Sequence, residues 1–176
     1  MSFADALSDA ITPWIHIVAV SVWLGPQFFM FLVTVPALRA VDDAEARLRI
    51  LRVINRRFGW LAWGAMIVIV LTGISNIFQV GADAPFDLWS TDFKFFHLFS
   101  LKMTLLAVVV LLTAVHTFVV GPQQMRLHEE MRGDAPEMAR LRRASMILSI
   151  LSLTGSMTVV LVAMILGDHD YSWQPT

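Results

Sequence analysis

The chain contains no cysteine. Disulfide bonds, thiolate metal sites and cysteine-ligated iron–sulfur clusters are therefore excluded from any account of its function. The N-terminal residues lack a positively charged segment followed by a cleavage pattern, so we expect no signal peptide. No stretch interleaves basic with aromatic residues in the manner of a nucleic-acid-binding surface, and we therefore expect no nucleic acid as a partner.

Basic residues are missing from most of the chain. Apart from Lys94 and Lys102, all of them are arginines in two short stretches, Arg39 to Arg57 and Arg126 to Arg143. Four apolar runs alternate with these stretches, and the mean hydropathy of +0.67 exceeds that of an ordinary soluble domain. Short loops rich in arginine stay on the cytoplasmic side of a membrane. We therefore expect both arginine-rich loops inside and both termini outside.

The four apolar runs predict an all-α fold, a polytopic bundle of four transmembrane helices. Each run exceeds the roughly 20 residues that a helix needs to cross the hydrocarbon core, and a helix satisfies its own backbone in lipid. We expect one membrane domain over residues 1–176, with spans at about 13–35, 58–80, 93–120 and 144–166 and cytoplasmic loops at 36–57 and 121–143. The lipid bilayer is its main partner. The predicted location is a bacterial-type inner (plasma) membrane, where the protein would be multi-pass and homodimeric.

Three helix starts are predicted from local residues. Pro13 fits the start of the first helix, since proline at the first helical position sacrifices no hydrogen bond. Asp42 with Glu45 resembles a capping box, followed by apolar residues at helical spacing. We therefore expect the second helix to begin in the first arginine-rich stretch, as an amphipathic extension of the second span. A third helix is expected to start at Pro136 and to continue into the fourth span.

The chain also contains a weak internal repeat. Pro36 and Pro122 are separated by 86 residues, and so are the two Arg-Arg pairs at 56–57 and 142–143. The tripeptide Leu-Thr-Gly occurs at 71–73 and again at 153–155, at a slightly different offset. Parallel two-helix repeats would produce this pattern, but we favour chance similarity between apolar helices as its explanation.

Ionisable residues inside spans are costly and mark functional sites. His16 lies just inside the outer end of the first span, and His97 lies about one turn inside the outer end of the third. His116 is about 28 Å further along the third helix and cannot share a small site with His97. Two histidines at matched depth are the minimal requirement for axial ligation of haem b in a helix bundle. The sequence predicts such a haem near the outer face, and histidines bonded to backbone or lipid headgroups are the alternative.

Three further residues complete the predicted cofactor-binding set, in which no residue is assigned as catalytic. Lys102 lies deep in the third span, where its ammonium would pair with a haem propionate or snorkel to the interface. Asn76 belongs to a polar stripe, with Thr72, that either bonds neighbouring helices or lines the pocket. Trp23 shares a face with His16 and is either a wall for a planar ligand or a packing residue.

Copper is the alternative ligand. Thioethers suit Cu(I), but the methionines of the spans are scattered over depths and faces, so we expect them to be apolar filler. His16, His97 and the segment 168–170 (Asp-His-Asp) would bind Cu(II) at the outer surface only if the C-terminal tail folded back. His169 and His116 are therefore secondary candidates for metal ligands.

Three segments resemble the CopD/HemJ-like membrane protein superfamily. The run WIHIVAVSVWLG at residues 14–25 resembles its first helix. The run RRFGWLA at 56–62, followed by LTG at 71–73, resembles its second helix. The third span, with Lys102 and then His116, resembles its lysine-containing helix that ends at a proline such as Pro122. Together these segments extend from about residue 14 to residue 122.

The resemblance implies a four-helix membrane bundle linked to haem b or to copper handling. In HemJ-like members, which are similar to haem-binding protoporphyrinogen oxidases, a first-helix histidine and a third-helix lysine are functional. His16 and Lys102 occupy those places, whereas the run PQFF at 26–29 lacks the arginine and histidine of that pattern. We therefore favour a haem b protein in electron transfer or redox sensing, with a quinone or another redox partner. CopD-like copper transport or tolerance and HemJ-like protoporphyrinogen oxidase activity are the alternatives, and enzymatic oxidoreductase activity is left open.

Single cysteines introduced into this cysteine-free chain test the predicted orientation. We expect Ser8→Cys and Thr176→Cys to react with a membrane-impermeant maleimide in right-side-out vesicles, because the charge distribution places both termini outside. Gln124→Cys, in an arginine-rich loop, should react only after permeabilisation. Labelling of Gln124→Cys in intact vesicles would contradict the orientation.

Overall fold

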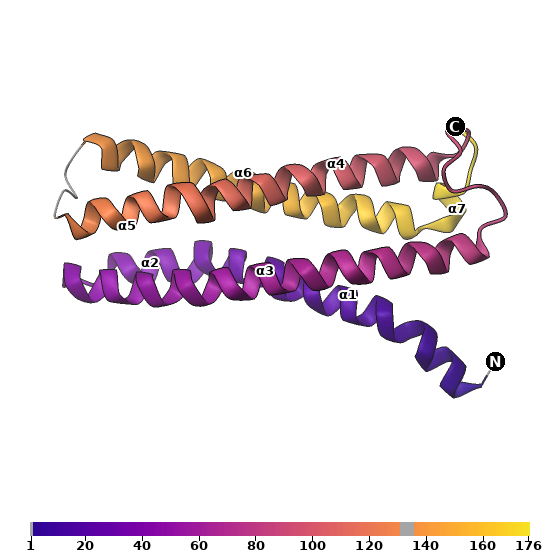
Figure 1. Cartoon of the computed structure of the whole chain (residues 1–176), viewed down its shortest axis with the longest axis horizontal. Helices are drawn as coiled ribbons and strands as arrows, with labels where there is room; N and C mark the ends of the chain where they lie inside the picture. Colours follow the sequence, from indigo (N-terminus) through magenta and orange to yellow (C-terminus); the bar gives the residue numbers. More distant parts are fainter. Residues whose placement is uncertain (1, 131–135) are drawn as a thin grey trace. The chain divides into compact units, whose positions relative to one another are not determined.

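The computed structural model describes residues 2–130 and 136–176, and within these ranges the chain is almost entirely helical (Figure 1). The described residues contain no β-strand beyond an isolated bridge between Phe93 and Pro175. Four helical segments are long and apolar enough to cross a membrane: Ala6–Arg39, Ala44–Asp83, Lys94–Leu127 and Pro136–Gly167. These segments confirm the predicted all-α fold with four transmembrane helices.

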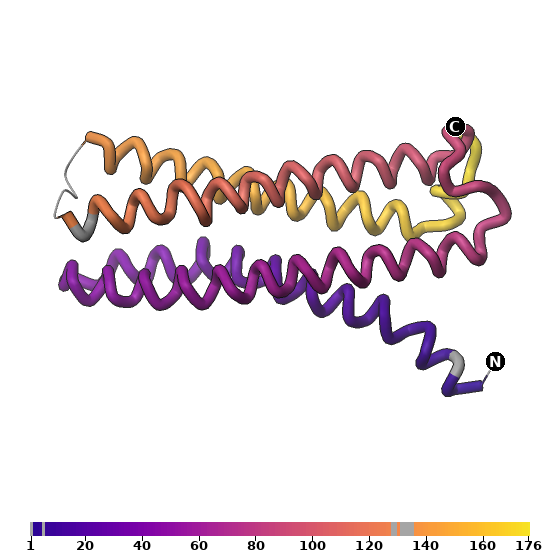
Figure 2. The backbone as a smooth tube through the Cα atoms, viewed as in Figure 1, coloured from indigo at the N-terminus to yellow at the C-terminus, as the bar shows by residue number. Residues whose placement is uncertain are grey.

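The chain divides into two compact units, Met1–Pro85 and Phe86–Thr176. The first unit contains α1 (Phe3–Phe29), the π-helical turn η1 (Met30–Thr34), α2 (Val35–Arg39) and α3 (Ala44–Asp83). Helix α1 packs along α3, and the N-terminal part of α1 diverges from α3 (Figure 2). Buried residues on the two helices are mostly small or apolar: Ala19, Trp23, Ala62, Ala65, Met66 and Ile69.

The second unit contains α4 (Lys94–Val115), the π-helical turn η2 (His116–Val120), α5 (Gly121–Glu129), α6 (Pro136–Gly167) and α7 (His169–Ser172). Helix α4 packs along α6, while the short α7 contacts both of them (Figure 1). The buried residues of this unit include two serines of α6 among apolar side chains: Phe95, Val109, Met138, Ser152, Ser156, Val159, Val162 and Leu166. Each unit is therefore built around one pair of long helices.

Two of the predicted helix starts are wrong. Helix α1 begins at Phe3 and continues through Pro13, because an interior proline removes one hydrogen bond but the flanking residues still extend the helix. The N-cap of α3 is Asp43 rather than Asp42, since its extended backbone directly precedes the first helical residue and its carboxylate accepts the Glu45 N–H at 2.9 Å. The predicted helical extension before the second span, and the helix start at Pro136, are confirmed.

The first long helix of each unit contains a π-helical turn, and the two turns lie 86 residues apart at 30–34 and 116–120. In each case the N–H that follows the turn bonds five residues back, from Val35 to Met30 and from Gly121 to His116. The next residue is a proline, Pro36 or Pro122, whose ring conflicts with the carbonyl four residues earlier in a regular α-helix. A widened turn accommodates that conflict. The turns and the unit boundary favour the two-helix repeat over the chance similarity that the sequence suggested.

The glycine of each Leu-Thr-Gly motif lies against the first long helix of its own unit. A Cβ added at Gly73 would lie 3.5 Å from His16 Cε1, which is ordinary van der Waals contact. A Cβ added at Gly155 would lie 2.6 Å from Val109 Cγ2, which is too close for a real contact. Helices α4 and α6 therefore approach so closely at Gly155 that only a hydrogen atom fits.

Replacing Gly155 by alanine should destabilise the second unit. Overpacking of this kind costs about 1–3 kcal/mol, and we expect a lower thermal unfolding temperature in detergent. Gly64→Ala is the matched control, because a Cβ at Gly64 meets nothing within 4 Å. The double variant Gly155→Ala/Val109→Ala should recover part of the loss, and a Gly155→Ala protein as stable as the unmodified chain would contradict the close approach.

Candidate functional site

His16 is held against α3 by a hydrogen bond between helices. Its Nδ1 lies 2.8 Å from the Oγ1 atom of Thr72, and that hydroxyl donates its single proton to the carbonyl of Val68 at 2.6 Å. With the hydroxyl proton directed to that carbonyl, the Thr72 oxygen accepts a hydrogen bond from Nδ1–H, in the tautomer whose lone pair is on Nε2. A histidine fixed in this way by its second nitrogen is the arrangement in which histidines bind metals.

Two other predicted site residues belong to the same unit as His16. Asn76 follows Thr72 by one helical turn, and its Oδ1 is buried without a hydrogen-bond partner. A buried acceptor that lacks a donor costs about 1–3 kcal/mol and often marks the place of a bound water or ligand. Trp23 is only 3% exposed, so it contributes to the packed interior of α1 and α3. The first unit thus places a fixed histidine and an unsatisfied amide oxygen on adjacent helices.

His97 occupies a different setting in the second unit. It is exposed near the start of α4, and its Nε2 donates to the carbonyl of Thr91 at 3.0 Å. The lone pair of the neutral ring is therefore on Nδ1, and ligation through Nε2 requires the ring to leave Thr91. His16 and His97 belong to different units, and their pairing across one haem stays a prediction.

Lys102 lies half-buried on α4, within a span. Among residues 2–130 and 136–176 it forms no hydrogen bond and no ion pair. An ammonium group at this depth is expensive unless it reaches the interface or meets an anionic group. Lys102 therefore remains the residue of the second unit that most needs an anionic ligand.

His116 joins the two long helices of the second unit at their arginine-rich end. Its Nε2 lies 2.8 Å from the Oγ atom of Ser145 on α6. This bond gives His116 a structural role as a link between the two helices. Its role as a metal ligand stays a prediction. Sequence reasoning missed Ser145 as its partner, because serines of the fourth span form a regular small-residue face in which no single member stands out.

The C-terminal tail folds back onto the start of α4. The backbone N–H of Lys94 donates to the carbonyl of Gln174 at 3.0 Å. The Nζ atom of Lys94 donates to the side-chain Oε1 of Gln174 at 2.9 Å. The same ammonium lies 4.4 Å from the ring centroid of Tyr171, within the range of a cation–π interaction. The Thr176 N–H donates to the carbonyl of Asp92 at 2.9 Å. The outer copper site considered from the sequence required this fold-back, for which the sequence carried no signal.

Aromatic rings complete this C-terminal cap. Phe86 stacks on Phe93 with ring centroids 4.0 Å apart and meets Trp173 edge-on at 5.9 Å. His169 stacks on Trp173 with ring centroids 4.2 Å apart. In the described part of the chain, no group of three histidines, aspartates or glutamates is placed to hold a metal ion. The cap brings His169 into an ordered setting without surrounding it with ligands.

A shallow hollow of about 480 Å³ lies beside the cap, lined by Leu98, Met164, Ile165, Asp168 and Tyr171. It offers one thioether and one carboxylate among apolar side chains. These two groups differ in the metals that they prefer, since thioethers suit soft ions and carboxylates suit hard ones. The hollow alone therefore does not define a metal site.

The helices and their embedded polar side chains define a polytopic α-helical membrane protein of two-helix hairpins. The family described as copper resistance protein D matches residues 52–166, more than half of the chain. The protein therefore belongs to the copper resistance protein D family. No curated protein and no solved structure matches it. The matched segment includes Asn76, His97, Lys102 and His116, whereas His16 precedes it.

Removing the indole at the centre of the cap should loosen the tail. Trp173→Ala deletes two ring contacts, each worth about 0.5–1.5 kcal/mol. We expect faster amide hydrogen exchange over residues 168–176 with little change in the middle of α4. Trp89→Ala is a control that leaves the Trp173 contacts intact, and unchanged exchange in Trp173→Ala would show that the tail is held by its backbone bonds alone.

Proposed function

We propose that the protein handles copper ions in the membrane, in transport or tolerance, with His16 as a copper ligand. Membership of the copper resistance protein D family supports copper as the cargo. The observation that carries the site is the bond between His16 Nδ1 and Thr72, because it favours the tautomer in which Nε2 is the metal-binding nitrogen. Imidazole nitrogen is a ligand that copper ions bind well.

Copper requires ligands beyond one imidazole. His97 is our candidate for a second, since its Nε2 bond to Thr91 leaves the lone pair on Nδ1. His169, ordered by its stack on Trp173, is a third candidate at the surface cap. Cargo bound by few ligands is held loosely, which suits an ion that has to be passed on.

Haem b is the second candidate, and Lys102 is the observation that favours it. An unpaired ammonium repels a copper ion but attracts a haem propionate. His16 and His97 would then be the axial ligands, with Asn76 and Trp23 beside the group. His16 fits this role in its present tautomer, whereas His97 would have to exchange its bond to Thr91. Bound haem would supply one-electron redox chemistry, with a quinone or another redox partner exchanging the electrons.

Copper content and the absorption spectrum of the purified protein separate the two candidates. We expect protein from copper-supplemented cells to retain copper by elemental analysis, and His16→Ala to lose most of it. Thr72→Val should weaken copper affinity about 10–100-fold, because the ring loses the group that orients it. Thr158→Val is the matched control, since that hydroxyl bonds only to the carbonyl of Thr154 in its own helix.

Binding of haem in place of copper would give a different and equally specific result. A sharp low-spin b-type spectrum on reduction with dithionite, lost in both His16→Ala and His97→Ala, would replace copper by haem. Loss of neither ligand in His16→Ala would show that His16 is not the binding residue. Protein that retains neither copper nor haem after growth with both would contradict the whole proposal.

A further inference from the structure

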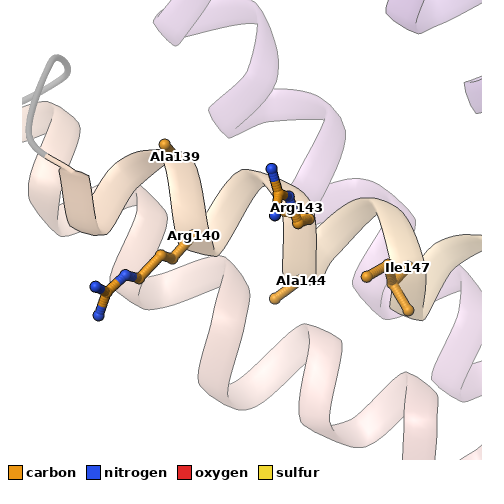
Figure 3. Close-up of a pocket in the computed structure, with 5 residues that line it drawn as sticks. All are labelled: Ala139, Arg140, Arg143, Ala144 and Ile147. Carbon is orange, nitrogen blue, oxygen red and sulfur yellow. The ribbon is translucent and has the colours of Figure 1, made fainter.

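The arginine-rich end of α6 carries a shallow hollow that neither proposed cofactor uses. It has a volume of about 340 Å³ and is lined by Ala139, Arg140, Arg143, Ala144 and Ile147 (Figure 3). At 3.6 residues per turn these five positions fall within an arc of about 140° on one helix. Arg142 lies outside that arc. The hollow is thus a feature of one face of α6 within the second unit.

Two alanines leave space beside the arginines. Ala139 and Ala144 end at Cβ, whereas Arg140 and Arg143 carry long side chains, whose guanidinium groups point in different directions in Figure 3. Both arginines are exposed, so their flexible side chains can turn toward one phosphate. Two guanidinium groups three residues apart on one helix face can bind it through several charge-assisted hydrogen bonds. The spacing along the helix therefore suits a compact anionic group.

The charges of these two arginines are unpaired. Neither Arg140 nor Arg143 forms an ion pair or a side-chain hydrogen bond with any part of the chain that the structure describes. Arg126, by contrast, lies 2.8 Å from Glu130, just past the end of its helix, and Arg49 lies 4.0 Å from Glu45. The hollow therefore joins two uncompensated positive charges where other arginines of the chain have acidic neighbours.

Below the arginines the same face becomes apolar and stays exposed. Ile147 is 50% exposed, and Ile150 and Leu151, one turn further into the span, are 42% and 50% exposed. Ile147 lies about 10 Å along the helix axis from Arg140. A ligand that fills both parts must carry an anionic group at one end and hydrocarbon at the other.

We propose that this face binds an anionic phospholipid, with its phosphate between Arg140 and Arg143 and an acyl chain along Ile147 and Leu151. Basic hollows at the ends of transmembrane helices are suited to anionic headgroups, because each basic residue attracts the phosphate. The apolar floor distinguishes a lipid from free phosphate, which would gain nothing from Ile147. The proposal is independent of whether the protein handles copper or haem.

Lipid binding to the detergent-purified full-length protein tests this proposal. We expect phosphatidylglycerol, titrated in native mass spectrometry, to bind at least fivefold more tightly than phosphatidylcholine. Arg140→Gln and Arg143→Gln should each reduce this preference and the double variant should lose it, whereas Arg142→Gln, which removes one charge outside the hollow as each single variant does inside it, should keep it. Unfolding temperatures measured in phosphatidylcholine establish that the variants are folded.

Three outcomes would overturn the assignment. An equal loss in Arg142→Gln would show that the preference reflects overall charge rather than the hollow. Unchanged preference in Arg140→Gln/Arg143→Gln would place lipid binding elsewhere. Competition by millimolar inorganic phosphate, combined with no effect of Ile147→Asn on lipid affinity, would identify a phosphate site without an acyl-chain groove.

Discussion

The structure depends on one constraint, that a bilayer interior offers no water to an unpaired polar group. The backbone satisfies this constraint through four long helices. The two π-helical turns beside prolines show how the hydrogen bonding is kept where a regular α-helix is not possible. At Pro36 and at Pro122 the chain cannot continue a regular hydrogen-bond ladder, and in both units the preceding N–H bonds five residues back instead. That the same solution recurs at an interval of 86 residues indicates two copies of one hairpin design rather than two unrelated adjustments.

The same constraint sorts the polar side chains of the spans into two groups. His16 with Thr72 and His116 with Ser145 are satisfied between helices of their own unit, so each pair stabilises a hairpin whether or not it also has a chemical role. Asn76 Oδ1 and the ammonium of Lys102 lack such partners in the described ranges. An unsatisfied amide oxygen and an unpaired charge are each costly to keep, and each is relieved when a water molecule or a ligand binds beside it in its own unit.

Much of the fold could be predicted because hydropathy and charge are properties of sequence segments. The four spans, the helical extension before the second span and the helix start at Pro136 follow from local patterns, and so does the repeat signalled by Pro36. What failed depended on fine backbone geometry or on long-range contacts. Asp42 and Asp43 are equally good capping residues by type, and only the backbone decides between them. The tail that reaches Lys94 makes its contacts across some 80 residues, which no local pattern encodes.

The candidate site shows the same division between residue type and arrangement. His16 and Lys102 stand out in the sequence because ionisable residues are rare in spans, but the tautomer of His16 follows only from the hydroxyl of Thr72. Family membership and local electrostatics then favour different ligands. The family favours copper, whereas Lys102 disfavours any cation near it, since two positive charges in a medium of low dielectric repel strongly. A copper ion near Lys102 would have to travel with an anionic ligand, while a haem propionate would be attracted directly. The charge carried by a ligand that binds beside Lys102 in the second unit would therefore distinguish copper from haem there.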